Sequence, residues 1–188
     1  MKKLKWLKWI ILAIFFCVII YVFVGNMGVV RESIDQYVAD ETLSEITAGN
    51  EIGQSFSYDQ NNLSGVSLKM ATYMRNNDGT IQVGIREMNE ENDIYQTSVK
   101  ANSISDNEYF DFRFPPIKFS KGKEYYVYIK SLDSIKGKSV TAYNSSIDTY
   151  DGGSLYINGE KQNKDLTFKV FYNRTVLNYI SDKIIGIF

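Results

Sequence analysis

The segment YFDFRFPP, residues 109–116, decides the fold class. Phe110, Phe112 and Phe114 alternate in it with charged residues, so one side of the segment is apolar and the other is polar. Successive side chains of a β-strand point to opposite faces, whereas the pattern of a helix repeats every 3.6 residues. The alternation therefore predicts a half-buried strand whose three rings point into a core.

The same two-residue period recurs along most of the chain. Other alternating segments are 52–58, 66–70, 81–85, 125–129 and 166–172, with weaker ones at 94–100, 140–145 and 154–157. Short groups of Asn, Asp, Gly and Pro separate them, which is the chemistry of turns. With no helical pattern in between, this predicts a mainly β domain over residues 47–172, an antiparallel β-sandwich of jelly-roll-like type.

A different pattern precedes this domain. Residues 9–30 contain no charge, and about 20 apolar residues are enough for a helix to cross a bilayer. All four basic residues of the first 30 lie in residues 1–8, which leaves 17 of the 21 basic residues against all 22 acidic residues in the rest. By the positive-inside rule, we expect a basic cytoplasmic tail (1–8), a single transmembrane helix (9–30) and an extracytoplasmic remainder, in a protein of the plasma membrane.

A cleaved signal peptide is the alternative for this segment. Its apolar region is usually 7 to 15 residues long and ends at a site of small residues. Here the apolar run is longer, and cleavage after Gly25 would place Phe23 at the position where a small residue is needed. The pattern therefore favours a retained signal-anchor.

Two further helical segments are expected beside the domain. Loosely helical spacing in residues 31–46 predicts a short helical stalk that continues the anchor. Apolar residues cluster on one side of residues 173–188, which predicts an amphipathic helix too short to cross a bilayer. This second helix could dock on the stalk, lie on the membrane surface or begin a membrane segment, and docking on the stalk is favoured.

Composition removes several classes of function. The 188 residues include no histidine and one cysteine, Cys17, so a catalytic triad with histidine, a zinc site and an internal disulfide are excluded. The net charge of -1 gives no basic excess for nucleic acid. The acids Glu87, Glu90, Glu91 and Asp93 fit a solvated strand end better than a glycosidase pair. We expect a protein that is not an enzyme and has no cofactor.

Calcium is the one metal ion that the sequence leaves open. Asp148 and Asp151 lie in the segment DTYDGG, where hard oxygen ligands stand beside a glycine turn. The ligand spacing of an EF-hand is missing, so a plain turn is the favoured interpretation. A structural calcium ion held by Asp148 and Asp151 is kept as the alternative.

The strand and turn phrases also carry a resemblance. In order they are GQSF, NLSGVSLKMATY, IQVGIRE, DNEYFDFRFPPI, KGKEYYVYI, YNSSIDTYDGGSLYINGE and DLTFKVFY. Together they resemble the β-sandwich modules, similar to carbohydrate-binding jelly rolls, of bacterial and archaeal membrane proteins of the glycosyltransferase and surface-polysaccharide kind. The resemblance covers residues 47–172 and implies an extracytoplasmic accessory module. The chain lacks the glycosyltransferase domain and the multi-span region of those larger proteins.

Two functions follow from these observations. One is a non-catalytic module that binds glycan in the cell envelope. Its partner would be a cell-surface polysaccharide or a membrane glycosyltransferase complex. Its expected site is Tyr143, Asn144, Asp148 and Tyr150, where the rings would stack on sugars and the polar groups would bind hydroxyls. The alternative is an interaction or assembly subunit of a larger membrane complex that binds no glycan.

Overall fold

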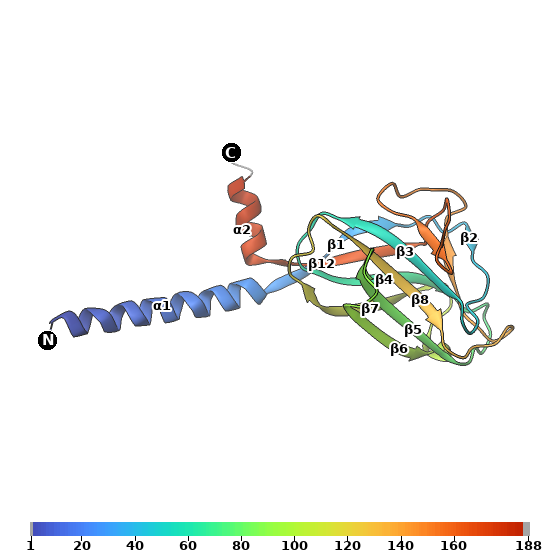
Figure 1. Cartoon of the computed structure of the whole chain (residues 1–188), viewed down its shortest axis with the longest axis horizontal. Coiled ribbons are helices and arrows are strands. Elements are labelled where there is room, and N and C mark those ends of the chain that lie inside the picture. The colour runs from blue at the N-terminus through green and yellow to red at the C-terminus, as the bar shows by residue number, and fades with distance from the viewer. Residues whose placement is uncertain (1, 186–188) are drawn as a thin grey trace. The chain divides into compact units, whose positions relative to one another are not determined.

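The structure is a computed structural model of the chain and describes residues 2–185, with the side chains of residues 6–23, 27–180 and 183 (Figure 1). It contains two compact units. One comprises residues 1–31 and 173–188 and the other residues 32–172. The described elements of the first unit are helices α1 (Lys2–Asn26) and α2 (Val176–Ile185), with the outer ends of strands β1 (Gly28–Gln36) and β12 (Phe168–Thr175).

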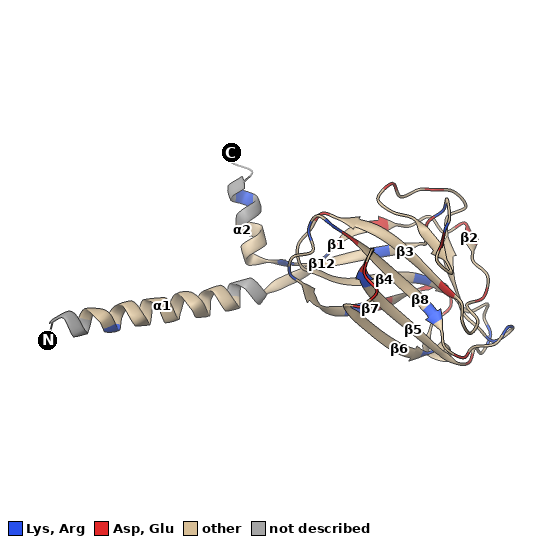
Figure 2. Ribbon diagram, in the orientation of Figure 1, with Lys and Arg blue, Asp and Glu red and all other residues tan. Residues whose placement is uncertain are grey.

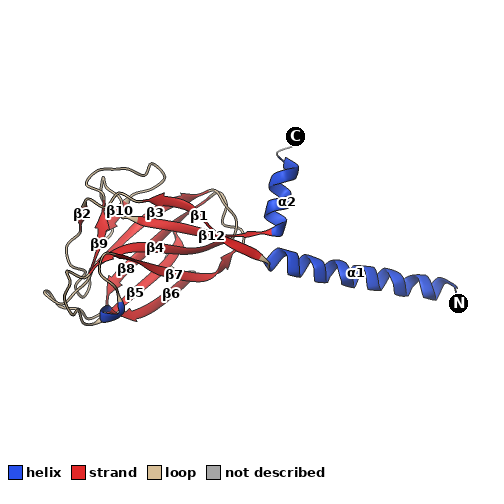
Figure 3. Ribbon diagram, turned by 180° about the vertical axis from the view of Figure 1, so that it is seen from behind, coloured by secondary structure: helices blue, strands red, loops and turns tan. Residues whose placement is uncertain are grey.

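The second unit is an antiparallel β-sandwich, as expected (Figure 3). Its first sheet has the strand order β1-β12-β4-β9-β2, with β7 also paired to β4. Its second sheet has the order β11-β10-β3-β8-β5-β6. The remaining bounds are β2 Glu41–Thr42, β3 Glu51–Tyr58, β4 Leu63–Ala71, β5 Thr80–Glu87, β6 Tyr95–Lys100, the 3-10 helix η1 Ala101–Ser103, β7 Glu108–Ile117, β8 Lys123–Ser131, β9 Thr141–Asn144, β10 Leu155–Ile157 and β11 Glu160–Lys161.

The connectivity is that of a jelly roll. From β3 to β12 the chain changes sheet at most of its connections, so strands that follow one another in sequence lie in different layers. Strand β7 is an edge, because among the strands that the structure describes it pairs only with β4. It carries Pro115 and Pro116 near its end.

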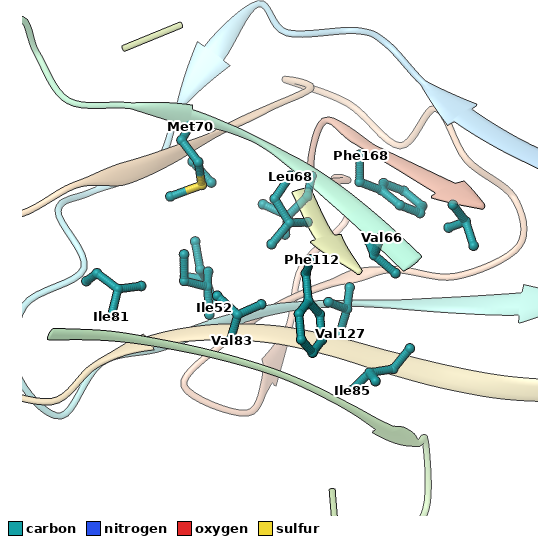
Figure 4. Packing of buried hydrophobic residues seen from close by; sticks show 14 of the residues in the cluster. Ile52, Val66, Leu68, Met70, Ile81, Val83, Ile85, Phe112, Val127 and Phe168 are labelled. Carbon is teal, nitrogen blue, oxygen red and sulfur yellow. The ribbon is translucent and has the colours of Figure 1, made fainter. Parts of the chain in front are cut away.

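The core lies between the two sheets, and the predicted strand register is confirmed. Phe112 and Phe114 are 4% and 8% exposed, their ring centroids are 5.2 Å apart, and Arg113 between them is exposed, as is Asp111 before them. Figure 4 shows Phe112 of the first sheet beside Val127 of the second, and Phe168 belongs to the same buried cluster. The period of two thus placed the apolar face of the alternating segments between residues 52 and 172 correctly.

The expected helical stalk at residues 31–46 is wrong. Residues 28–36 form strand β1, which pairs with β12, and residues 41–42 form β2. In the strand, the backbone N–H and C=O groups find hydrogen-bond partners in the sheet. The side-chain amide of Gln36 also donates to the carbonyl of Leu166 at 3.1 Å. Because no helical stalk is present in this segment, the expectation that the C-terminal helix docks on one is also wrong.

The expected bounds of the two terminal helices also change. Helix α1 includes residues 2–8, so the described part of the basic tail is helical, and it stops at Asn26 instead of residue 30. Gly and Asn commonly end helices, and the β-branched pair Val29 and Val30 favours the extended strand that follows. At the other end, β12 continues to Thr175 and α2 occupies residues 176–185 of the expected 173–188, whose last three residues lie outside the described residues.

The expected apolar span is present in α1. Residues 6–23 form a helix that is long and apolar enough to cross a membrane, and none of this window is buried within the protein. Figure 2 shows the contrast with the sandwich, where acidic and basic residues are distributed over the strands and loops. Cys17 is exposed on this helix.

Candidate functional site

The loop predicted as the binding site begins at strand β9. Asn144 is 1% exposed, and its side-chain amide donates to the carbonyl of Ser145 at 2.7 Å and to Glu41 at 3.3 Å. Tyr143 is half-buried, and the ammonium of Lys69 lies 4.9 Å from the centre of its ring. Asn144 therefore serves the packing of the strand end, while Tyr143 keeps a partly exposed ring.

The rest of this loop is held by Asp165, which is fully buried. One carboxylate oxygen accepts hydrogen bonds from the backbone N–H groups of Thr149 and Tyr150 at 2.8 and 2.9 Å. The other accepts from the side-chain amide of Gln54 at 2.9 Å. A buried carboxylate with several donors is a strong fixed point. Asp165 cannot be singled out from the sequence, because it lies in KQNKDL, a segment with the composition of an ordinary polar turn.

Tyr150 points toward the core of the sandwich. Its ring packs edge-on against Phe168 at 5.4 Å between centroids, and its hydroxyl donates to the carbonyl of Ser57 at 3.3 Å. Burial raises the pKa of Tyr150 to about 12. A Cβ on Gly153 would lie 1.8 Å from the carbonyl oxygen of Ser55, so the absence of a side chain at this glycine lets the loop backbone approach strand β3 closely.

Asp148 and Asp151, the calcium candidates, are both exposed. Within the described residues, no group of three or more His, Cys, Asp or Glu side chains could hold a metal ion. The tight turn at Gly152 and Gly153 is explained by contacts inside the protein, because a Cβ on Gly152 would lie 2.4 Å from the hydroxyl of Tyr150.

A second cluster lies on the outer face of the second sheet. Across neighbouring strands, Tyr128 of β8 stands opposite Gly53 of β3 and Gly84 of β5. A Cβ on Gly84 would lie 2.5 Å from the hydroxyl of Tyr128, and one on Gly53 would lie 2.2 Å from the ring of Tyr126. The two rings therefore lie over glycines that leave room for them.

Arg86 covers both rings. Its guanidinium carbon is 4.7 Å from the centre of the Tyr126 ring and 5.0 Å from that of Tyr128, and the two rings are stacked with centroids 6.3 Å apart. Tyr156 of β10 packs edge-on against Tyr126 at 5.6 Å. Cation–π contacts of this kind hold a guanidinium flat above an aromatic surface.

Two carboxylates complete the cluster. Glu51 and Asp93 each lie 3.7 Å from Arg86, and they accept hydrogen bonds from the hydroxyls of Tyr126 and Tyr128 at 3.1 and 2.5 Å. Burial raises the pKa of both tyrosines, so the phenols remain protonated donors. We call this set the tyrosine–arginine face; it comprises Glu51, Arg86, Asp93, Tyr126, Tyr128 and Tyr156.

The tyrosine–arginine face has hydrogen-bonding capacity left over. Within the described part of the chain, the inner carboxylate oxygen Oδ1 of Asp93 has no hydrogen-bond partner, although Arg86 lies 3.7 Å away. The side chains of Arg86, Glu51 and Asp93 are 24%, 26% and 18% exposed, so solvent and solutes reach their edges. A planar cation and two carboxylates suit a ligand with several hydroxyl groups, and Tyr156 at their side keeps a partly exposed ring, whereas the rings of Tyr126 and Tyr128 beneath Arg86 are buried.

Only fragments of this face can be recognised in the sequence. Asp93 lies in an acidic group whose pattern predicts a solvated strand end. Tyr126 and Tyr128 lie on the outward phase of KEYYVYI, where large aromatic residues have no core to enter. The usable signal was the pair Gly53 and Gly84 on the outward phase of two other strands, but register across strands was needed to bring them together.

No protein-family model matches the chain, and no curated protein sequence matches it. The fold and the described surface define a jelly-roll-like β-sandwich joined to an N-terminal helix of membrane-spanning length.

Proposed function

We propose that the protein is a membrane-anchored, non-catalytic module that binds glycan on the tyrosine–arginine face. The observation that carries the proposal is the convergence of Arg86, Glu51 and Asp93 over two buried tyrosine rings on one outer sheet face. Sugar hydroxyls need both donors and acceptors at short range, and planar charged side chains provide them in pairs. The resemblance of residues 47–172 to carbohydrate-binding jelly rolls supports the same ligand class.

The proposal moves the binding surface away from the loop at residues 143–150. Tyr150 and Asn144 already have partners in the packing of the sandwich, so little of either side chain is available to contact a sugar. Tyr143 is half-buried and Asp148 is exposed, so both can still contact a ligand, but the ring of Tyr143 already lies beside the ammonium of Lys69. The glycan would belong to a cell-envelope polysaccharide, met on the extracytoplasmic side of a plasma-membrane anchor.

The test uses the full chain in nanodiscs and its retention on immobilised cell-envelope polysaccharides. Asp93→Asn preserves shape and removes one carboxylate, and Arg86→Gln removes the planar cation. We expect each to weaken retention about tenfold or more, because a charged hydrogen bond is worth about 1.5 to 3 kcal/mol. Lys138→Gln, an exposed lysine on the loop before β9, is the matched control. Melting temperatures show whether the variants remain folded.

Unchanged retention in both folded variants would overturn the proposal. Loss of retention in the control as well would show that general charge, and not this face, holds the polymer. A wild-type chain that retains no polysaccharide would favour the second function below.

A second function, docking of a protein partner, is favoured by the loop after β4. Tyr73 and Met74 both have positive φ, 57° and 53°, and the side chain of Met74 is 91% exposed. Such a backbone is rare for residues other than glycine and is kept where the surroundings impose it. Here Asp106 accepts hydrogen bonds from Thr72 and helps to fix the loop. Met74→Ser should then reduce recovery of a membrane partner in crosslinking from intact cells, while polysaccharide retention stays unchanged.

A further inference from the structure

The junction between the two terminal segments is a fixed structure. Thr175 is buried and caps α2, because its hydroxyl accepts a hydrogen bond from the backbone N–H of Asn178 at 3.2 Å. The backbone N–H of Val176 donates to the carbonyl of Met27 at 3.2 Å. The start of α2 is therefore tied to the residue that directly follows α1.

A groove of about 370 Å³ opens at this junction. Its apolar surface comes from side chains that are exposed by 42% to 61%, although they are large and apolar. These are Met27, Val29, Val176 and Tyr179. Such a surface is costly to leave in water and indicates a contact with another molecule.

Basic groups stand at the same groove. Arg31 and Arg174 line it, and the guanidinium of Arg174 lies 5.2 Å from the centre of the Tyr179 ring. The ammonium of Lys183 lies 5.8 Å from that ring. Residues 27–31 and 173–185 contain these three basic residues and one acid, Asp182, so the sequence around the groove has an excess of positive charge.

The position in the chain identifies the occupant. The apolar window of α1 ends at residue 23, and the groove begins four residues later. At that distance from a membrane span, a side chain meets the glycerol and headgroup region, where tyrosine and arginine are commonly found. Arginine binds phosphate through two parallel hydrogen bonds, and apolar side chains beside it can cover the first part of an acyl chain.

We propose that this groove binds a phospholipid of the membrane leaflet that surrounds the end of α1 nearer to residue 27. Arg31 and Arg174 hold the phosphate, and Met27, Val29 and Val176 cover the glycerol end of an acyl chain. Tyr179 lies at the level of the headgroup. The site is distinct from the tyrosine–arginine face and rests on α1 crossing the membrane; it makes no use of glycan binding.

The experiment uses the full chain in vesicles that contain a phospholipid with a photoreactive headgroup. In the wild type, we expect labelled peptides to cover residues 27–31 and 174–179. The double variant Arg31→Gln/Arg174→Gln should reduce labelling of these peptides about 25-fold, since each arginine near an anionic headgroup contributes roughly fivefold. Lys136→Gln/Lys138→Gln, two exposed lysines on a sandwich loop, should leave it unchanged.

A second measurement on the wild type needs no variant. A photoreactive diacylglycerol has the same chains but no phosphate, and it should label the two peptides much less than the phospholipid does. Equal labelling by the two probes would overturn the proposal, as would unchanged labelling of the double variant. Loss of phospholipid labelling in excess inorganic phosphate would also overturn it, because the groove would then recognise the free anion.

Discussion

The carboxylate of Asp165 and the side-chain amide of Gln54 form a buried hydrogen bond of 2.9 Å, although 111 positions separate them in the sequence. Gln54 in turn accepts from the backbone N–H of Leu166 at 2.8 Å. This exchange joins β3 of one sheet to the segment that leads into β12 of the other. It also fixes Asp165 in the position from which it holds the loop at Thr149 and Tyr150.

We expect Asp165→Asn to lower the free energy of unfolding by about 1 to 3 kcal/mol. Asparagine has one acceptor oxygen where aspartate has two, so it cannot accept both from Gln54 and from the backbone of the loop. A buried donor is then left without a partner. Urea unfolding of the full chain in detergent measures the change. Asp148→Asn, an exposed aspartate in the same loop, is the control and should change stability little. Similar losses in both variants would contradict a specific role for Asp165.

Phe112→Ala should cost about 3 to 5 kcal/mol of stability, because the ring is 4% exposed and its removal leaves a cavity between the sheets. Asp111→Ala, on the opposite face of the same strand, should cost much less, since its carboxylate lies at the surface beside Arg113. The same unfolding measurement compares the two. A larger effect at Asp111 would mean that the strand register is shifted by one residue.

Gly84→Ala should destabilise the second sheet by about 1 to 3 kcal/mol, because the added methyl group overlaps the ring of Tyr128. The overlap disappears in a Tyr128→Ala background, where the same substitution should be neutral or slightly stabilising, since alanine costs less backbone entropy than glycine. A double-mutant cycle isolates the coupling between the two positions. Additive effects would show that the ring does not lie over the glycine.

Asp106 makes the sandwich sensitive to acid. Hydrogen bonds from the backbone and hydroxyl of Thr72 hold the pKa of Asp106 below its usual value of 3.8. A carboxyl group whose pKa is lowered in the folded state adds stability above its unfolded pKa, and this contribution is lost as the pH falls through the folded value. Asp106→Asn should therefore reduce the difference in melting temperature between neutral pH and about pH 3. An unchanged difference would contradict the prediction.

The apolar span of α1 gives a topological prediction. The full chain should remain with membranes after carbonate extraction, and protease added outside intact cells should digest the sandwich, because the four lysines of residues 1–8 favour the cytoplasm. Deleting residues 9–23 should release the protein from the membrane. Recovery of a soluble wild-type form that begins near Gly25 or Gly28 would instead show cleavage of a signal peptide.

The fold was largely predictable because a sandwich strand has one dry face and one wet face. Phe112, Val127 and Phe168 follow that rule, and the structure places all three in the core. Strand β1 was not predictable in the same way: its apolar residues Val29 and Val30 are exposed, so its state depends on backbone pairing with β12 and not on burial. Residues with little core to enter give little period to detect.

The candidate site depended on information that one strand does not contain. Tyr128, Gly84 and Arg86 meet because β5 and β8 pair in one register, and each of the three residues is unremarkable in its own segment. The loop at residues 143–150 showed the reverse problem. Its tyrosines and aspartates have the composition of a binding site, but the buried carboxylate of Asp165, 15 residues beyond Tyr150, directs Tyr150 inward.

Strand β7 bears on how neighbouring copies would meet if α1 anchors them in one membrane. Proteins anchored in a plane meet repeatedly through their sides, and an unpaired strand offers a row of backbone groups to the next molecule. Pro115 and Pro116 have no N–H to offer, so the end of this edge cannot extend a continuous sheet from one copy to the next. Neighbouring copies can therefore crowd together and still remain separate molecules along this edge.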